Sequence, residues 1–305
     1  MEISHEKTTC IGFGFSTLAD AFQAGREAAQ MAKSQTPDSP IDLALAVGPA
    51  DIHFKDFVEG VRLVTGENAL LGISAPWVFS TEAPNPRSRT VLLIQADRQR
   101  ISVVSSPEEA SPLVAVTSLL TDLRALRGNA RLDHDFHGII AIDNNADASR
   151  QSLVHHLAAD AGLESWLTGF ALWPGSNAPI ICGPHRLQHG VAAIECLSSG
   201  PWGLGWVDTS AFPPDAGVRR EAAHSSMREA LAQLQSRKPC AGLLLIASSG
   251  EPVPELEGRD LFHSAGLAVS NVPLIGIPVR APYVRADGRT VAHATEGIIS
   301  LLVPQ

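Results

Sequence analysis

The chain has little positive charge, few cysteines and no long apolar run. Of its 305 residues, 23 are Lys or Arg and 32 are Asp or Glu, so the formal net charge is −9. Because binding to the phosphates of nucleic acid requires a basic surface, this balance argues against nucleic acid as a main partner. No stretch approaches the roughly eighteen consecutive apolar residues of a transmembrane helix, which argues against a membrane-spanning protein.

The few cysteines also bear on where the protein resides. The four cysteines do not form a Cys-x-x-Cys motif, and residues 1–7 lack the basic run and apolar core of a secretory signal. We therefore expect a reduced, cytoplasmic protein. Cys182 and Cys196 fall in predicted strands, where a buried and unreactive thiol is expected.

Familiar catalytic and metal motifs are also lacking. The sequence has no Gly-rich phosphate loop with lysine and no dinucleotide-binding glycine motif after a strand. Ser16 and Ser74 each follow Gly-x but lack the second glycine of the Gly-x-Ser-x-Gly elbow. Residues 133–137 and the pair His185 and His189 offer metal ligands, yet neither group has the pattern of a zinc site, so no metal is predicted.

What the chain does have is an internal repeat. An apolar strand, an amphipathic helix and a short apolar segment with a central glycine occur three times, and the central glycines are Gly72, Gly169 and Gly276. Their separations of 97 (169 − 72) and 107 (276 − 169) residues are too long for a solenoid. This spacing is typical of a compact α/β unit that is used three times.

After each central glycine the pattern predicts a turn and two more strands, so the repeated unit is β-α-β-β-β. Antiparallel hairpins are expected at the turns of residues 96–98 and 285–288. The predicted fold class is α/β (mixed α+β), with mixed sheets flanked by helices in an α/β/β/α sandwich. An opening strand at residues 8–15 precedes a helix at residues 18–34, for which Ser16 or Thr17 is the expected N-cap.

Polar residues 128–137 indicate a boundary between two domains, at residues 1–130 and 131–305. Residues 200–214 are rich in Gly, Pro and Trp, which favours a loop over a packed surface that acts as an interface or a lid. A helix is expected at residues 221–235.

Two apolar segments with a central glycine resemble the FIST family of intracellular ligand-sensing proteins. Residues 68–76 are similar to its apolar-Gly-Cys-Ser/Thr-x-Gly-Glu segment, and residues 271–277 are similar to its Val-Pro-apolar-apolar-Gly-Phe segment. Residues 293–295 resemble the family's closing motif, and the resemblance covers nearly the whole chain. The family's Gly-Glu pairs are replaced here by Pro76-Trp77 and Arg280-Ala281.

The resemblance implies a FIST N-terminal-like and a FIST C-terminal-like domain, and a non-catalytic sensory module for signal transduction. Its ligand would be a small molecule such as an amino acid or a related carboxylate, and a separate protein would supply the signalling output. Because ligands bind where strand ends meet helix N-termini, backbone N–H groups and short polar side chains near those ends are the expected contacts. The candidate ligand-binding residues are Gly72, Ser74, Ser248, Ser249, Gly276, Arg280 and His293.

Other functions stay open at this stage. Some FIST-like proteins bind haem through a histidine, and His53, His185 and His293 would be the histidines to test for a haem-based gas sensor. A scaffold that only recruits partners is a second alternative. An uncharacterised hydrolase, with Ser74 or Ser248 as nucleophile, is the third.

Overall fold

The computed structural model describes residues 9–67, 69–82, 85–96, 99–106, 112–127, 136–144, 166–173, 180–187, 190–198, 200–211, 215–248, 250–286, 289–291 and 296–305. The helices in these residues are α1 (Ala21–Lys33), α2 (Phe54–Thr65), α3 (Pro112–Arg127), α5 (Ala216–Gln233) and α6 (Glu255–Gly266). None of these helices has the length and apolar character that crossing a membrane requires.

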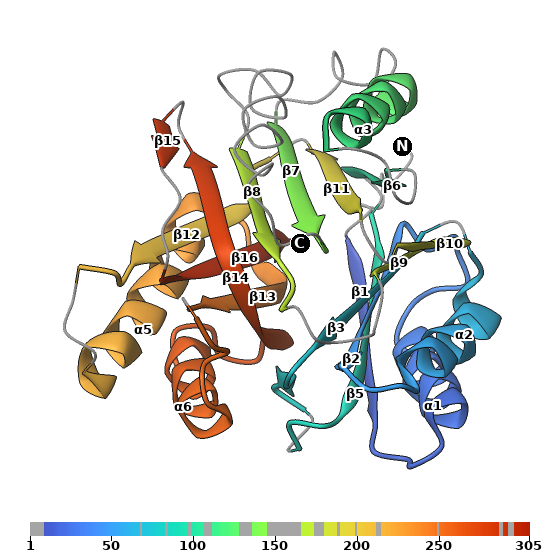
Figure 1. Cartoon of the computed structure of the whole chain (residues 1–305), viewed down its shortest axis with the longest axis horizontal. Helices are drawn as coiled ribbons and strands as arrows, with labels where there is room; N and C mark the ends of the chain where they lie inside the picture. Colours follow the sequence, from blue (N-terminus) through green and yellow to red (C-terminus); the bar gives the residue numbers. More distant parts are fainter. Residues whose placement is uncertain are drawn as a thin grey trace, which may run out of the picture.

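The strands form two mixed sheets, which confirms the predicted fold class (Figure 1). The six-stranded sheet has the order β1-β5-β2-β3-β9-β10, and the ten-stranded sheet contains the path β12-β16-β13-β14-β8-β7-β11-β6, with β4 and β15 attached to β14. The strand bounds are β1 Cys10–Ser16, β2 Leu43–Pro49, β3 Leu70–Ala75, β4 Phe79–Ser80, β5 Arg89–Gln95, β6 Gln99–Ser105, β7 Phe136–Asp143, β8 Trp166–Ala171, β9 Ile180–Cys182, β10 His185–Leu187, β11 Val191–Ser198, β12 Gly203–Asp208, β13 Pro239–Ala247, β14 Leu274–Ala286, β15 Arg289–Val291 and β16 Gly297–Pro304.

Three units of the same topology make up the chain. Unit 1 (residues 10–95) has the strand order β1-β5-β2-β3, unit 2 (residues 99–198) has β6-β11-β7-β8, and unit 3 (residues 203–304) has β12-β16-β13-β14. In each unit the last two strands of this order are parallel and the other neighbours are antiparallel. The predicted β-α-β-β-β repeat is present in units 1 and 3, whereas residues 145–165, between β7 and β8 of unit 2, lie outside the described residues. An additional strand and helix precede the repeat in every unit.

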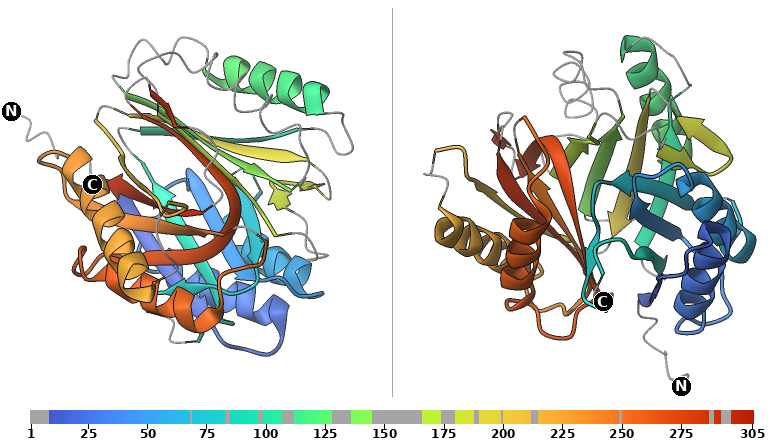
Figure 2. Two further views of the ribbon diagram at one scale, coloured as in Figure 1. Left: turned by 60° about the vertical axis from the view of Figure 1, so that its left-hand side comes forward. Right: turned by 60° about the horizontal axis from the view of Figure 1, so that its bottom comes forward.

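Each unit also sends an arm to a neighbouring unit. β9 of unit 2 pairs with β3 of unit 1, β4 of unit 1 pairs with β14 of unit 3, and the second half of β14 pairs with β8 of unit 2. All three contacts are antiparallel, and together they close a cycle. The long, curved β14 that joins two units is visible in Figure 2.

The central glycines lie where the arms cross. In register, Gly72 is opposite Ile181, Gly276 is opposite Phe79, and Gly169 is opposite Tyr283. A Cβ on Gly72 would lie 2.9 Å from Val58 of α2, and one on Gly276 would lie 2.5 Å from the Phe262 ring of α6. Gly72 and Gly276 thus serve packing between a strand and its covering helix.

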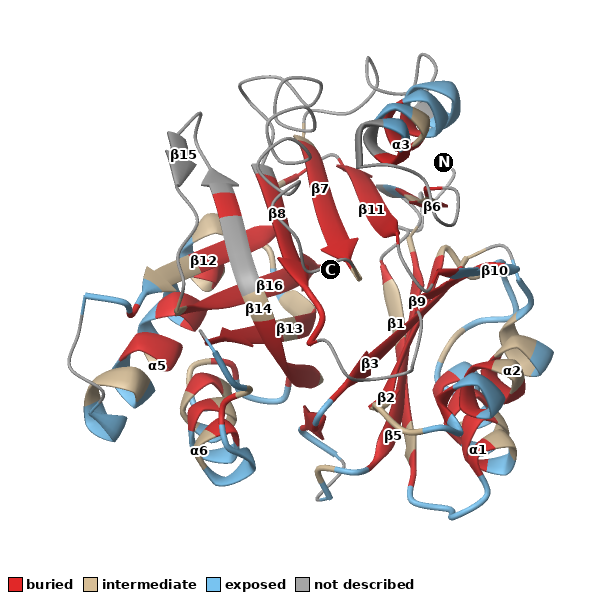
Figure 3. Cartoon of the chain, viewed as in Figure 1, coloured by how far each residue is buried: buried red, intermediate tan, exposed pale blue. Residues whose placement is uncertain are grey.

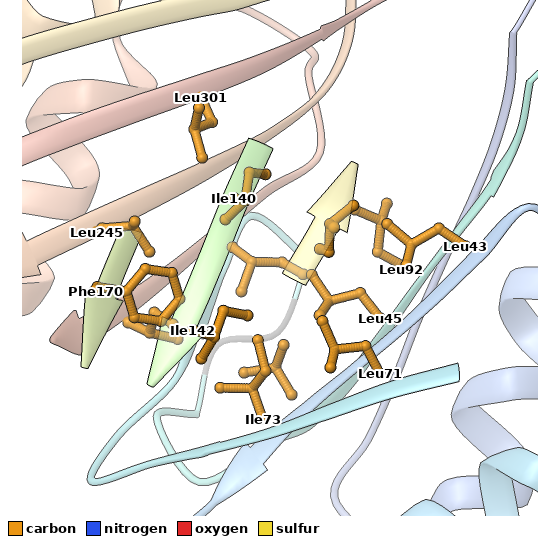
Figure 4. Close-up of a cluster of buried hydrophobic side chains, with 14 of the residues drawn as sticks. Leu43, Leu45, Leu71, Ile73, Leu92, Ile140, Ile142, Phe170, Leu245 and Leu301 are labelled. Carbon is orange, nitrogen blue, oxygen red and sulfur yellow. The ribbon is translucent and has the colours of Figure 1, made fainter. Parts of the chain in front are cut away.

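The main core lies between the two sheets. Figure 4 shows Leu45, Leu71 and Ile73 of unit 1 close to Ile142 and Phe170 of unit 2, and all of them are at most 5% exposed. Leu245 and Leu301 of unit 3 belong to the same cluster. The helices cover the outer faces of the sheets and expose their polar sides (Figure 3). Because the core draws side chains from all three units, burial of apolar area couples them.

The backbones of α1 and α2, which form the outer layer of unit 1, approach each other closely. A Cβ on Gly25 of α1 would lie 2.0 Å from the carbonyl oxygen of Phe57, and one on Gly60 of α2 would lie 2.1 Å from that of Phe22. The two helices therefore cross at reciprocal glycines. α1 begins after Asp20, whose side chain accepts the N–H of Gln23, so Asp20 rather than Ser16 or Thr17 is the N-cap.

Two local predictions are wrong. β5 and β6 flank the turn at residues 96–98 but belong to different sheets, so they do not form a hairpin. Residues 203–208, expected within a loop, form β12, because Gly203 and Gly205 let α5 approach the strand. The hairpin at residues 285–288 is confirmed, with β15 as the partner of β14.

The helix expected at residues 221–235 is α5. The division into two domains at residue 130 stays a prediction, and that boundary lies between α3 and β7, which are consecutive described elements of unit 2.

We predict that Gly60→Ala destabilises the protein, because the new methyl group overlaps the Phe22 carbonyl. The expected loss is about 1–3 kcal/mol in urea unfolding, as for overpacked cores. Gly266→Ala in α6 is the matched control: its Cβ would lie 4.0 Å from the nearest atom, Leu274 Cδ1. That change should stabilise by about 0.4–1 kcal/mol through lower chain entropy. Equal effects of the two changes on stability would contradict the close crossing of α1 and α2.

Cys182 provides a pH-dependent test of the arm in β9. Burial raises the pKa of this thiol from 9.0 to about 11. Between these values the unfolded chain binds fewer protons than the folded chain, so stability should fall as the pH rises from about 9 to 11. Urea unfolding of the native protein and of Cys182→Ala over this range should show a steeper fall for the native protein. Parallel curves would mean that Cys182 is not buried by the arm.

Candidate functional site

The structure divides the predicted ligand-binding residues between two sheets. Gly72 and Ser74 lie in β3 of the six-stranded sheet, whereas Gly276 and Arg280 lie in β14 of the ten-stranded sheet. Ser248 follows β13, and its hydroxyl donates to the carbonyl of Glu251 at 2.6 Å, which closes a turn. Ser249 and His293 lie outside the described residues.

Arg280 takes part in a contact that the sequence did not indicate. Its guanidinium carbon lies 5.3 Å from the centre of the Trp173 ring, which is a cation–π distance. In register, Arg280 is opposite Ala171 of β8, which is opposite Asp143 of β7. Asp143 is buried, so an arginine and a carboxylate lie on strands on either side of β8 at the junction of units 2 and 3.

A second polar group lies at the equivalent strand ends of unit 1. We call it the unit 1 row: Ser16 in β1, Arg89 in β5, Gly48 in β2 and Ser74 in β3. Ser16 is opposite Arg89, Gly48 is opposite Ser74, and a Cβ on Gly48 would lie 3.5 Å from Arg89 Cγ. Gly48, Ser74 and Arg89 lie two residues along their strands from Ala46, Gly72 and Val91, and Ala46 and Val91 pack on α1 and α2, so the row faces the helices.

Arg89 is the centre of the unit 1 row. Its side chain is only 10% exposed and its Nη2 donates to Asp51 Oδ2 at 2.9 Å. Nη1 lies 3.5 Å from the Leu18 carbonyl oxygen, and the buried Nε has no hydrogen-bond partner. Asp51 also accepts the N–H of His53 at the start of α2. Gly48 leaves the space along which the stem of Arg89 reaches this turn.

Ser16 is held next to a carboxylate. Its hydroxyl donates to Glu27 Oε2 of α1, and its oxygen accepts the N–H of Leu18 at 3.2 Å. Ser16 is 2% exposed, whereas Glu27 is exposed. A serine hydroxyl bound to a carboxylate and adjacent to an arginine unites a potential nucleophile, its proton acceptor and a cation.

Polar atoms without partners occur on both faces of the sheet at the beginning of β5. The buried atoms Ser88 Oγ, Arg89 Nε and Thr90 Oγ1 have no hydrogen-bond partner and belong to three consecutive residues. By strand alternation Arg89 faces the helices, while Ser88 and Thr90 face the inner side of the sheet. Buried polar groups are nearly always paired, so the unpartnered Arg89 Nε marks the helix-facing side of β5 as a place that a ligand or water completes.

The other two units differ at the equivalent positions. In unit 3 the corresponding residues are apolar: Val207, Ile298, Ile246 and Pro278. Trp77 from the arm of unit 1 fills the space beneath α6, where it packs on Gly258 and donates to the Val253 carbonyl at 2.8 Å. Unit 2 has Ser106, Val191, Asp143 and Ala171. Only the unit 1 row combines serine with a buried cation.

The candidate cofactor residues do not converge in the described part of the chain. No group of three His, Cys, Asp or Glu side chains there could hold a metal ion. Of the histidines considered for haem, His53 and His185 are exposed. Residues 133–135 and His189, which carried potential metal ligands, lie outside the described residues.

Sequence reasoning reached part of the unit 1 row and missed its centre. Ser16 and Ser74 stood out as serines after Gly-x. Arg89 was not among the candidate residues. The signal was available: an arginine that opens a seven-residue apolar strand must either be exposed or be paired. Glu27 had no local signal, because it is one polar residue on an amphipathic helix.

Comparison with known proteins finds solved structures that are similar to this chain. Neither a protein-family model nor a curated protein sequence matches the chain. A cyanuric acid hydrolase from A. caulinodans is 10% identical, with a TM-score of 0.49 over 98% of this chain and 99% of that chain. A second structure, described as a cyanuric acid hydrolase that arose by structural concatenation, is 10% identical, with a TM-score of 0.47 over 98% and 100%.

These comparisons correct the family and the function expected from the sequence. Membership of the FIST family is wrong, because no family model matches and the similar solved structures are cyanuric acid hydrolases. The sensory, signal-transducing module for amino acids or carboxylates rested on that membership and is wrong with it. The two segments that carried the resemblance contain Gly72 and Gly276. Packing against α2 and α6 requires apolar residues around a glycine in both segments.

The Arg89–Asp51 pair yields a prediction for stability. Asp51→Asn keeps an acceptor for the His53 N–H but removes the charge opposite a buried guanidinium. Because Asp51 is 37% exposed, the expected loss is modest, about 1 kcal/mol in urea unfolding. Arg89→Met in the Asp51→Asn background should recover the loss, since no buried charge then stays uncompensated. Additive losses would contradict this coupling.

Proposed function

We propose that the protein is a hydrolase that cleaves an ester or amide bond of a small polar substrate at the unit 1 row. The observation that carries this proposal is the hydrogen bond from the Ser16 hydroxyl to the Glu27 carboxylate beside the buried Arg89. A nucleophile, a proton acceptor and a donor for a developing negative charge are the minimum for acyl transfer. The same function was an open alternative at the level of sequence.

The reaction follows from the positions of these groups. Ser16 Oγ attacks the acyl carbon, its proton passes to Glu27, and the protonated leaving group departs to leave an ester on Ser16. Glu27, again ionised, then takes a proton from a water molecule that attacks this ester. Breakdown of the ester returns a proton to Ser16 and releases the acid. No redox partner is needed.

Arg89 supplies the electrostatic part. Its Nε–H has no hydrogen-bond partner and is available to the oxygen that becomes negative during attack. Asp51 holds the far side of the guanidinium at 2.9 Å and thereby orients it. Ser74 is three strands from Ser16, about 14 Å at the usual strand spacing. It would therefore contact the remote part of a substrate and not the reacting bond.

Access to Ser16 sets a structural requirement. Since Ser16 is almost fully buried, the connection between β1 and α1 must move to admit a substrate. Leu18 in this connection is exposed, so its displacement uncovers little apolar area. Such an opening is of the kind that loops undergo around many active sites. We also place the enzyme in the cytoplasm, because all four cysteines are free.

The proposal predicts labelling of Ser16 by a fluorophosphonate and turnover of at least one member of a panel of nitrophenyl esters, linear amides and cyclic amides that includes cyanuric acid. Ser16→Ala should lower kcat/KM by about a thousandfold or more. Glu27→Gln should lower it by about a hundredfold or more, since the proton acceptor is lost. Arg89→Met should lower kcat by a similar factor while KM changes less.

Ser106→Ala is the matched control. Ser106 occupies the equivalent position in unit 2, but its neighbour in β11 is Val191 in place of an arginine. This variant should retain labelling of Ser16 and turnover. If labelling and turnover persist in Ser16→Ala, the active site lies elsewhere in the protein. A folded protein that neither reacts with the fluorophosphonate nor turns over any substrate would refute the hydrolase.

A further inference from the structure

A groove in unit 3 shares no lining residue with the unit 1 row. It has a volume of about 1120 Å³ and lies between the arm of unit 1 and the helices of unit 3. Phe79, Thr81 and Glu82 line it from the arm, and Phe262, His263 and Gly266 line it from α6. We call it the α6 groove. The proposed hydrolase mechanism makes no use of it.

The internal repeat explains why this groove exists. Val58 of α2 contacts Gly72 as Phe262 of α6 contacts Gly276, and both helices lie the same distance before their strands in sequence. The helix residue four positions further on is Arg62 in α2 and Gly266 in α6. A Cβ on Gly266 would meet only Leu274 Cδ1, at 4.0 Å. The α6 groove is thus open where unit 1 has an arginine side chain.

In unit 1 that arginine binds the incoming arm. Arg62 Nη2 donates to the carbonyl oxygen of Gly183 at 2.6 Å, and Nη1 pairs with Glu59 at 2.9 Å. The N–H of Gly183 in turn donates to the carbonyl of Leu70. The guanidinium therefore occupies a defined place between the helix and the turn of the arm.

The α6 groove keeps a carbonyl acceptor for such a group and lacks the arginine, and His263 stands at the position of Glu59. The N–H of Thr81 donates to the carbonyl of Leu274, just as Gly183 does to Leu70, so the Thr81 carbonyl takes the place of the Gly183 carbonyl. Two carboxylates line the groove, Glu82 and Asp260, and neither has a salt-bridge partner among the described residues. The rings of Phe79 and Phe262, 6.0 Å apart, offer aromatic surface.

The cations of the groove do not fill this place. Arg220, Arg259 and His263 also line it, and all three are exposed, so their charged ends can turn to water. A guanidinium suits the remaining chemistry better than an ammonium, because it is planar, stacks on aromatic rings and donates to several acceptors at once. We propose that the α6 groove binds a guanidinium group on an aliphatic chain, from an arginine side chain of a peptide or from a small alkylguanidine.

The test uses the full chain and two matched pairs of probes. Calorimetric titration at constant ionic strength compares n-butylguanidinium with n-butylammonium, and the blocked peptide Gly-Arg-Gly with Gly-Lys-Gly. Each guanidinium probe should bind about tenfold or more tightly than its ammonium partner. Binding of both guanidinium probes assigns the site to the group itself, and binding of the peptide alone assigns it to a peptide ligand. Equal affinities within both pairs would overturn the proposal.

Three substitutions locate the binding. Gly266→Arg should abolish it, because the new side chain would occupy the place that Arg62 occupies in unit 1. Asp260→Asn and Glu82→Gln, both at exposed positions, should each weaken it severalfold and keep the fold intact. Arg62→Gly is a positive control that should open a second site in unit 1. Binding that is unchanged in Asp260→Asn, Glu82→Gln and any folded Gly266→Arg protein would refute this location.

Discussion

The pairing of each arm with the third strand of another unit is the constraint on which the rest of the structure depends. β3, β14 and β8 would otherwise present open edges, and each is covered by a strand from a different unit. The inner faces of all three units then meet in one apolar core. No unit can bury its inner face alone, so strand pairing and core formation depend on one another.

That constraint explains where small residues are required. Gly72 and Gly276 lie between an arm on one side and a helix on the other, and a side chain there would displace Val58 or Phe262. The helices approach equally closely: a Cβ on Gly205 would lie 1.7 Å from the Ser226 carbonyl oxygen of α5. Glycine at these places is dictated by architecture. It therefore provides no information on the ligand or the reaction.

The difference between local sequence patterns and contacts between distant segments accounts for what the sequence could predict. The repeat, its central glycines and the mixed sheets follow from periodicity, which is local. The partners of β5 and β6 could not be read from the short turn at residues 96–98, because the chain there leaves one sheet for the other. β12 was hidden since glycine and tryptophan normally favour a loop, whereas here the glycines admit α5. The unit 1 row depends on strands that are far apart in sequence, so only its individual residues could be recognised.

The three units share one strand order, but their residue types differ at the strand ends, two residues beyond the central glycines. At that level the packing of arms and helices no longer demands one residue type: unit 3 is apolar there and is filled by Trp77, whereas unit 1 has Ser16 and Arg89. A buried arginine whose Nε lacks a partner costs stability, and an apolar residue such as Ile298 satisfies the same fold without that cost. The fold therefore does not explain Arg89. Its retention at a strand end, next to a serine bound to a carboxylate, is the departure from symmetry that requires a function.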